Sequence, residues 1–273
     1  KFLLKTLKKI NYNVLQIINF ISFYPRVQVF SRTKHAIHKI MDSDINFCPN
    51  KIWADKLSEL GFNTSQISVV GNPSFDSLAK KTDKHSKLRN NKKIQVLLCT
   101  SPMYEHGHWS KKKEFQLISE IVNTVEKIPN TKISIKIHPS TSDLIEFQNL
   151  AKKFDSIVPI YQKENLIDLI NENDLIITYG DSTVTIYGVL LKKSMIFVNL
   201  PSLIAWNLYF DSNLMHECKN ISNLPTLITS ALKSIPDDKF YKIYVNKNLG
   251  TFDGNSSKRI ADNIIQLIEH KKN

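Results

Sequence analysis

Two short polar turns carry most of the residues in this sequence that could do chemistry. Each follows an apolar segment that predicts a buried strand. The first turn contains His138, Pro139 and Ser140. The second precedes a predicted helix and contains Gly180, Asp181, Ser182 and Thr183. Parallel sheets bind ligands outside the carboxyl ends of their strands, and a helix start offers free N–H groups to an anion. The turns therefore predict a site for a phosphate-bearing small molecule, with nucleotide sugars as the leading candidates.

Each turn has a functional and a structural interpretation. The imidazole of His138 could donate a hydrogen bond to a phosphate or a sugar hydroxyl, or it could be a surface histidine beside a turn proline. Asp181 or Ser182 could cap the helix predicted at 183–191. The functional interpretation adds that the hydroxyls and amides of Ser182 and Thr183 hold a diphosphate or a ribose.

A third polar segment, the loop 101–109, carries two histidines, a carboxylate, a glycine and two aromatic residues. Tyr104 or Trp109 could stack on a base or sugar. Glu105 or His106 would then lie near the reacting bond as candidate catalytic residues. The alternative is a solvated loop with a packed tryptophan. A zinc site would need further ligands at firmer spacing, so we expect no metal.

Two other turns have plain structural explanations. Gly71 and Asn72 follow a short predicted strand and predict a tight turn that redirects the chain between domains, although their amides could also face substrate beside a cleft. Near the C-terminus, Asn255 or Ser256 should cap a helix. Arg259 on that helix could contact a phosphate or point to solvent.

The elements that must position these residues alternate between strands and helices after residue 93. Apolar runs predict strands at 94–100, 133–138, 157–160, 175–179 and 195–199. Helices are predicted between them at 112–127, 142–154, 166–171 and 183–191, followed by two more at 224–234 and 257–271. This alternation is typical of a parallel sheet covered on both faces and joined by right-handed crossovers. The predicted fold class is α/β with a Rossmann-like parallel sheet.

We expect four regions along the chain. Residues 1–78 form a partial N-terminal domain, with strands at 45–48 and 67–70 around a helix at 51–60. Residues 79–93 are a polar, lysine-rich linker. Residues 94–252 form the Rossmann-like domain, and residues 253–273 a C-terminal helix.

The first 24 residues alternate basic and apolar positions at helical spacing, and Pro25 would end that helix. Such a helix could lie on an anionic membrane surface or pack on its own domain.

Composition limits the classes of function. The chain has 273 residues, a formal net charge of +12 and 42% hydrophobic residues, as in a globular protein. Its lysines are scattered without a nucleic-acid-binding module, so we expect no nucleic-acid partner. Three distant cysteines predict neither zinc nor a disulfide framework, and point to a reducing compartment. No apolar run is long enough to span a membrane. We therefore expect a cytoplasmic protein, and contact of residues 1–24 with the inner face of the membrane is the alternative to their packing on the domain. Since the sequence begins with Lys1, we expect a fragment.

Four segments in this order resemble the GT-B fold of nucleotide-sugar proteins. They are residues 68–78 (SVVGNPSFDSL), 135–140 (IKIHPS), 168–196 (DLINENDLIITYGDSTVTIYGVLLKKSMI) and 253–265 (DGNSSKRIADNII). The similar branch contains UDP-N-acetylglucosamine 2-epimerases, CDP-glycerol glycerophosphotransferases and capsule polysaccharide transferases. The resemblance implies that His138, Ser182 and Thr183 contact donor phosphate, that the C-terminal helix crosses back to the first domain, and that no metal or other cofactor is needed.

The sequence also departs from this pattern. A glutamate-alanine pair usually follows the Ser-Thr turn, and here Tyr187 and Gly188 stand in its place. That glutamate often holds the donor ribose, so the identity of the nucleotide is open among UDP, CMP and CDP. The Ser-Gly-Gly type of turn found in the 2-epimerases is absent, and most strands of a usual first domain are missing.

The predicted function is a metal-independent transferase that moves a sugar or polyol phosphate from a nucleotide donor to a surface glycan or lipid-linked acceptor. An acceptor hydroxyl would be deprotonated while His138, Ser182 and Thr183 stabilise the leaving diphosphate. The alternatives are a UDP-N-acetylglucosamine 2-epimerase and a non-catalytic nucleotide-sugar-binding subunit.

Overall fold

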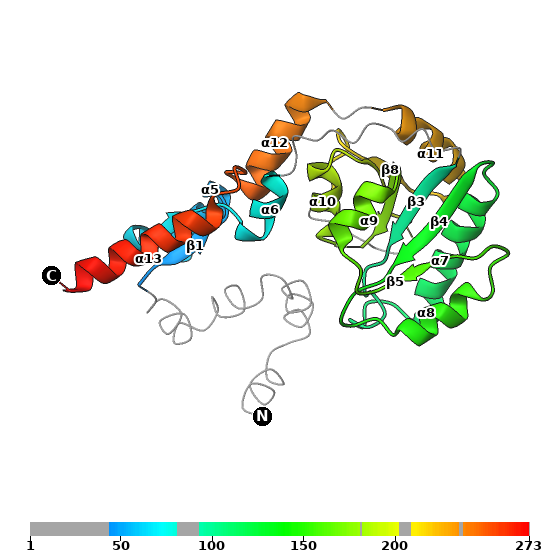
Figure 1. Ribbon diagram of the computed structural model, residues 1–273, viewed down its shortest axis with the longest axis horizontal. Coiled ribbons are helices and arrows are strands. Elements are labelled where there is room, and N and C mark those ends of the chain that lie inside the picture. The colour runs from blue at the N-terminus through cyan, green and yellow to red at the C-terminus, as the bar shows by residue number, and fades with distance from the viewer. Residues whose placement is uncertain (1–43, 81–92, 181, 202–208, 235–236, 273) are drawn as a thin grey trace. The chain divides into compact units, whose positions relative to one another are not determined.

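The computed structural model describes residues 44–80, 93–180, 182–201, 209–234 and 237–272. Internal contacts divide the chain into two compact units (Figure 1). The smaller unit comprises residues 1–76 and 249–273, and the larger unit comprises residues 77–248. The predicted helix at 1–24 and most of the predicted linker lie outside the described residues. The domain boundaries drawn from the sequence stay predictions.

The larger unit is built on a six-stranded sheet in which every pairing is parallel. Its strands are β3 (Ile94–Cys99), β4 (Thr131–Lys136), β5 (Ile160–Tyr161), β6 (Leu175–Tyr179), β7 (Ser194–Val198) and β8 (His216–Cys218). They lie side by side in the order β5-β4-β3-β6-β7-β8. Counted along the chain from β3, this is the order 3-2-1-4-5-6 of a dinucleotide-binding Rossmann sheet. The predicted α/β class and parallel sheet are confirmed.

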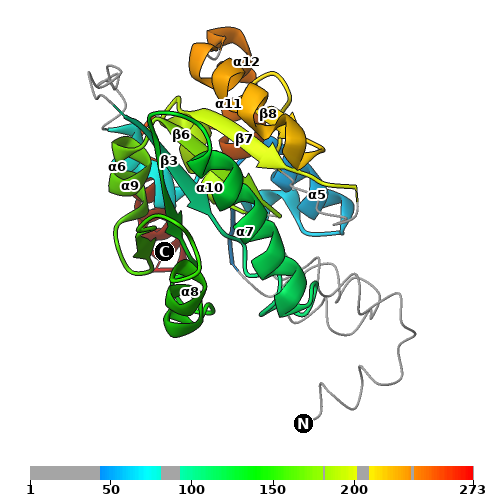
Figure 2. The ribbon, with the colours of Figure 1, turned by 90° about the vertical axis from the view of Figure 1, so that its right-hand side faces the viewer.

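Helices cover both faces of this sheet (Figure 2). Because successive strand side chains point to opposite faces, Val96 and Leu98 pack on one side and Leu97 and Cys99 on the other. The first core also receives α7 (Lys111–Glu126), α8 (Leu144–Ala151) and α11 (Leu224–Lys233). The second receives α9 (Leu166–Glu172), α10 (Val184–Leu190) and the first part of α12 (Asp238–Leu249). A sheet apolar on both faces explains the unbroken apolar runs in the sequence.

Several element boundaries differ from the sequence predictions. Strand β4 begins and ends two residues earlier than predicted, so His138 lies in the loop beyond it. The strand predicted at 157–160 is instead the two-residue β5, and the Ile157 side chain is 96% exposed. Strand β8 and helix α12 were not predicted. Their sequences, HEC and DKFYKIYVNKNL, lack a clear apolar period.

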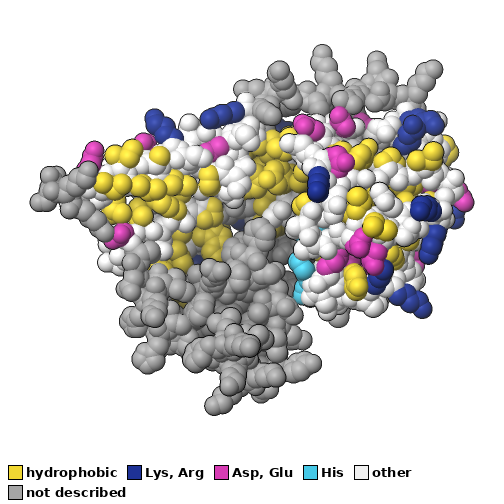
Figure 3. Space-filling view, turned by 60° about the horizontal axis from the view of Figure 1, so that its bottom comes forward, with side chains coloured by type: hydrophobic (Ala, Val, Ile, Leu, Met, Phe, Trp, Pro, Cys, Tyr) yellow, Lys and Arg dark blue, Asp and Glu magenta, His cyan; other side chains and the backbone are white. Residues whose placement is uncertain are grey.

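The smaller unit contains two short parallel strands and their helices. Strands β1 (Asn46–Cys48) and β2 (Ile67–Val69) pair around α5 (Lys51–Glu59), and α13 (Ser256–Lys272) follows near the C-terminus. Helix α6 (Asp76–Ala79) begins at the last residue of this unit's first segment. Figure 3 shows hydrophobic side chains on the surface of this unit, where Ile264, Ile265 and Ile268 of α13 are exposed.

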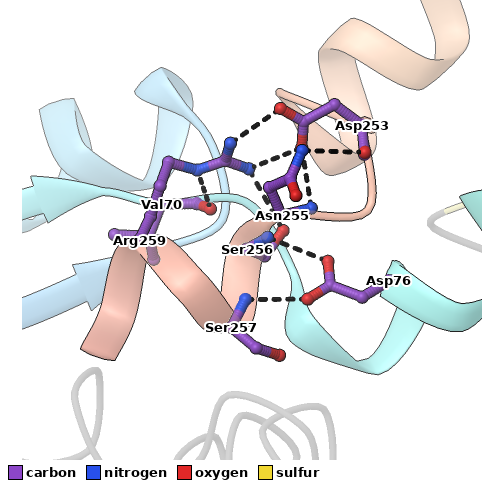
Figure 4. Close-up of polar contacts among 7 residues, drawn as sticks. All are labelled: Val70, Asp76, Asp253, Asn255, Ser256, Ser257 and Arg259. Carbon is purple, nitrogen blue, oxygen red and sulfur yellow. Dashed lines mark hydrogen bonds and ion pairs between the residues drawn. The ribbon is translucent and has the colours of Figure 1, made fainter. Parts of the chain in front are cut away.

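The start of α13 is capped from a distant part of the chain. The two carboxylate oxygens of Asp76 accept hydrogen bonds from the backbone N–H groups of Ser256 (2.9 Å) and Ser257 (2.7 Å) (Figure 4). Asn255 stands at the predicted N-cap position, where its carbonyl accepts a 3.0 Å hydrogen bond from the backbone N–H of Arg259, but its side-chain amide donates to the carbonyl of Asp253. The predicted cap by Ser256 is wrong, because Ser256 is already the first helical residue and its N–H donates to Asp76. Arg259 neither points freely to solvent nor lies open to a phosphate. Its guanidinium donates to Asp253 and to the carbonyl of Val70.

Candidate functional site

Strands β4 and β5 are added on one side of β3, and β6, β7 and β8 on the other, so the strand order reverses between β3 and β6. The candidate site lies at the carboxyl ends of these two strands. At such a point one connection leaves over each face of the sheet, which opens a crevice for a ligand. The hydroxyl of Ser101, two residues beyond β3, donates a 2.6 Å hydrogen bond to the carbonyl of Tyr179, the last residue of β6. Both residues are buried. This bond ties the 101–109 loop to the turn that begins at Gly180.

Gly180 is the point where that turn meets the loop. Its φ of +67° lies in the left-handed region that favours glycine. A Cβ atom there would lie 2.8 Å from Met103 Sδ and 3.1 Å from Ser101 Cβ. The glycine therefore serves both the backbone geometry and the close packing of the two segments.

His138, two residues beyond β4, has a defined tautomer. Its Nδ1 accepts hydrogen bonds from the backbone N–H of Thr141 (3.3 Å) and from that of Ser140 (3.4 Å). The Thr141 hydroxyl is 2.8 Å from the same nitrogen. Since Nδ1 is an acceptor, the proton of the neutral ring is on Nε2, which is left as a donor. Thr141 was not singled out from the sequence, and only the three-residue spacing in the HPST turn could have indicated it.

The charges around His138 favour its neutral form. Burial lowers the pKa of the imidazole, the nearby His106 and Lys136 lower it further, and Glu105 opposes them. Glu105 and His106 come from the loop after β3, so the structure brings these predicted residues close enough to His138 to shift its pKa. One carboxylate oxygen of Glu105 is buried without a hydrogen-bond partner among the described residues. Figure 3 shows histidine side chains at this unit's surface.

The turn after β6 places Ser182 and Thr183 before α10. Ser182 Oγ accepts from the backbone N–H of Val184 at 3.3 Å, so its side chain helps to cap the helix. Thr183 precedes the helix with a helical backbone and makes no side-chain capping bond. Tyr187 is half-buried on α10 and packs against the second core. Asp181 lies outside the described residues.

Gly71 and Asn72 belong to the smaller unit. Gly71 has a φ of +84°, and a Cβ there would lie 2.8 Å from the carbonyl oxygen of Thr251. The Asn72 side chain accepts from the backbone N–H of Ser74 at 3.0 Å. These contacts account for a tight turn packed against the segment that leads into α13.

Glu114 in α7 is a buried acid beneath the loop that was not predicted from the sequence. Its carboxylate contacts Tyr179 and the backbone of Tyr104. Glu114 shares the inward face of α7 with Leu117, Ile118 and Ile121. An acid within an apolar stripe at helical spacing is a signal that could have found it.

The described part of the chain contains neither a metal cluster nor a membrane-spanning helix. No three side chains among its histidines, cysteines, aspartates and glutamates are placed to hold a metal ion. No helix within the same residues is both long and apolar enough to cross a membrane.

Solved structures with the same fold include several 2-epimerases. A UDP complex of S. aureus MnaA matches with a TM-score of 0.57 and 15% identity, over 88% of this chain and 66% of that one. The UDP-GlcNAc 2-epimerase of Methanocaldococcus jannaschii, in complex with UDP-GlcNAc and UDP, matches with a TM-score of 0.53 and 21% identity, over 82% and 61%. That of Neisseria meningitidis, bound to UDP-GlcNAc, matches with a TM-score of 0.54 and 15% identity, over 82% and 62%.

The Rossmann order of the sheet and these structural likenesses show a Rossmann-like fold of the GT-B class. The family model described as UDP-N-acetylglucosamine 2-epimerase matches residues 33–265. The chain belongs to this family. It spans 61–66% of the length of the three solved structures above. No curated protein matches it.

Proposed function

We propose that this chain binds a UDP-linked sugar at the carboxyl ends of β3, β4 and β6, as part of an enzyme that acts on that sugar. The observation that supports this most is the site at the switch point, where Ser101 joins Tyr179 across β3 and β6. His138 lies beside it with an Nε2–H donor. The family, and the solved structures of similar proteins in complex with UDP and UDP-GlcNAc, support the choice of nucleotide.

The ligand is held by hydrogen-bond donors rather than by a metal. The Nε2–H of His138 donates to a diphosphate oxygen, and the hydroxyls of Ser182 and Thr183 donate to the same group. A neutral imidazole donor costs less to desolvate than an imidazolium, and preorganised donors stabilise a diphosphate without rearrangement. Pro139 and Ser140 fix the turn that aims His138. Tyr187 stands in place of the expected ribose-binding glutamate, and its half-buried side chain contacts the ribose.

The reaction that we propose first is inversion at carbon 2 of UDP-N-acetylglucosamine. This reaction needs groups that remove and return a proton on the two faces of the sugar. Glu105 and His106 are the candidates from this chain, because both lie near His138 and both occur in the loop that borders the site.

Transfer of the sugar to an acceptor is the second candidate. It is favoured by the Asp-Ser-Thr turn, which stands where the 2-epimerases have a Ser-Gly-Gly type of turn. The acceptor would be a glycan or a lipid-linked molecule. The basic and apolar residues 1–24 would then bring the enzyme to the inner face of the membrane.

Binding is tested by isothermal titration of the protein with UDP-N-acetylglucosamine, UDP, CDP, CMP and GDP. We expect saturable binding of the two uridine nucleotides, with each of the others at least about tenfold weaker, which is about 1.4 kcal/mol. Equal affinity for all five would contradict a UDP-sugar site. Absence of binding at millimolar concentrations would contradict the proposal as a whole.

The two reactions are separated by incubating the enzyme with UDP-N-acetylglucosamine alone. Formation of the 2-epimer without an acceptor supports epimerisation. Consumption of the nucleotide sugar only when a glycan or lipid-linked acceptor is added supports transfer. Binding without either reaction would leave a nucleotide-sugar-binding subunit.

A further inference from the structure

The buried carboxyl of Glu114 joins three elements beneath the candidate site. Glu114 lies in the first turn of α7 and is 1% exposed. Its Oε1 accepts a 2.6 Å hydrogen bond from the hydroxyl of Tyr179 at the end of β6. Its Oε2 accepts a 2.7 Å hydrogen bond from the backbone N–H of Tyr104 in the 101–109 loop. One side chain therefore fixes the loop to both the sheet and the helix.

Tyr179 and the neighbour of Glu114 in sequence, Lys113, also contact the far end of the loop at Trp109. The rings of Trp109 and Tyr179 are stacked, with centroids 5.6 Å apart and planes 19° apart. The ammonium of Lys113, next to Glu114 in sequence, lies 5.5 Å from the Trp109 ring centroid. Tyr104 and Trp109 bracket Glu105 and His106, so the contacts of Glu114 and Tyr179 determine where these two candidate catalytic residues lie.

Glu114 also has a charge state that can change near neutral pH. Burial raises the pKa of its carboxyl to about 7, although the hydrogen bonds from Tyr179 and Tyr104 oppose this shift and the nearby Glu105 adds to it. Tyr179 from β6 and Glu105 from the loop are the titratable side chains that face it among the described residues. Residues of α11 packed on the same side are apolar, namely Leu224, Ile228 and Ala231.

We propose that Glu114 is a positioning residue: its carboxyl holds the 101–109 loop in place, and gain or loss of its proton changes the contacts that fix the loop. An ionised carboxylate accepts both hydrogen bonds as charge-assisted bonds, which are roughly twice as strong as neutral ones. A protonated carboxyl must direct its O–H toward one of these partners or away from both. For ligand affinity, this inference rests on the proposed UDP-sugar site.

The protonation step is tested through Trp109, which packs on the Tyr179 partner of Glu114. In a Trp53→Phe, Trp206→Phe background, Trp109 is the only tryptophan. Its fluorescence should titrate with a midpoint at about pH 7. Glu114→Gln should abolish this transition, whereas Glu120→Gln on the exposed side of α7 should retain it. No transition in the parent, or the same transition in Glu114→Gln, would overturn the proposal.

Ligand binding tests the positioning role separately. At about pH 8, Glu114→Leu should weaken binding of UDP-N-acetylglucosamine about tenfold, because it leaves the Tyr179 hydroxyl and the Tyr104 N–H without their acceptor. Glu114→Gln, which keeps an acceptor and the volume, should stay within about threefold of the parent. Folded Glu114→Leu with parental affinity would overturn the positioning role. If the parent itself does not bind, the UDP-sugar proposal fails, and the Trp109 titration still decides whether Glu114 controls the loop.

Discussion

At the residue scale, the hydrogen bonds to Nδ1 of His138 determine what the imidazole offers a ligand. Backbone N–H groups can only donate, so the ring nitrogen that receives them must accept, and the proton must be on Nε2. Burial and neighbouring positive charge lower the pKa of His138. At neutral pH the side chain is therefore a neutral donor of fixed orientation.

His138→Ala should weaken binding of UDP-N-acetylglucosamine about tenfold or more, because a hydrogen bond to a charged group contributes about 1.5 kcal/mol or more. Thr141→Val should weaken it less, since it removes only the hydroxyl beside Nδ1. Isothermal titration at pH 8 measures both. Unchanged affinity in His138→Ala would make the histidine purely structural.

Glu114 should make stability depend on pH in a way that its glutamine variant lacks. Its carboxyl has a pKa of about 7 in the folded state, against an ordinary value of 4.5. The unfolded chain therefore ionises first, and stability is lost as pH rises from about 4.5 to about 7, by up to about 3 kcal/mol. Urea denaturation across this range should show the wild-type free energy of unfolding falling relative to Glu114→Gln. A constant difference would contradict a raised pKa.

At the element scale, two effects of substituting Gly180 on stability can be separated: the loss of packing against the 101–109 loop, and the strain of a left-handed backbone at residue 180. Gly107 offers a matched control, because its φ of +74° is similar but a Cβ there would have no atom within 4 Å. Gly107→Ala should lower the free energy of unfolding by about 1–2 kcal/mol, because of the left-handed backbone alone. Gly180→Ala should cost about 1 kcal/mol more and weaken UDP-N-acetylglucosamine binding, because Met103 and Ser101 must move. Equal costs in thermal denaturation would contradict the close contact.

The distant cap of α13 gives a prediction for the smaller unit. Asp76→Ala should lower its stability by about 1 kcal/mol, the usual effect of losing an N-terminal cap. Asp55→Ala is the control, because its exposed pair with Lys51 should contribute less than about 1 kcal/mol. Burial would raise the pKa of Asp76, but hydrogen bonds from Ser257 and Ser256 outweigh it and lower the pKa. The contribution is therefore present at neutral pH and lost on acidification, which denaturation at pH 7 and about pH 3 would measure. Equal effects of the two variants at pH 7 would refute the cap.

The sequence predicted most of the elements because a sheet buried on both faces produces unbroken apolar runs. Strand β6 was predicted at its observed bounds, since all five of its residues are buried. The Asp76 cap could not be predicted, because 180 residues separate its carboxylate from Ser256. The same limit applies to Ser101 and Tyr179, which are 78 residues apart. The local sequence shows that polar residues follow each strand. Which of these polar segments meet depends on the order of the strands in the sheet, which the local sequence does not give.

At the scale of the whole molecule, the chain belongs to the UDP-N-acetylglucosamine 2-epimerase family and has a Rossmann sheet whose switch point carries polar residues. The larger unit supplies His138, Ser182 and the loop with Glu105 and His106. The smaller unit is held by its own contacts, including Asp76 with Ser256 and Arg259 with Asp253. Binding of the nucleotide sugar is the claim that the residues of the larger unit can be tested for directly, before its conversion is tested.

The measurement that tests the central claim most directly is a crystal structure of the protein with UDP-N-acetylglucosamine. We predict that the diphosphate lies outside the carboxyl ends of β3, β4 and β6. A diphosphate oxygen should lie within hydrogen-bonding distance of His138 Nε2, and another beside the turn formed by Ser182 and Thr183. A nucleotide sugar bound elsewhere on the protein, with these residues untouched, would contradict the account.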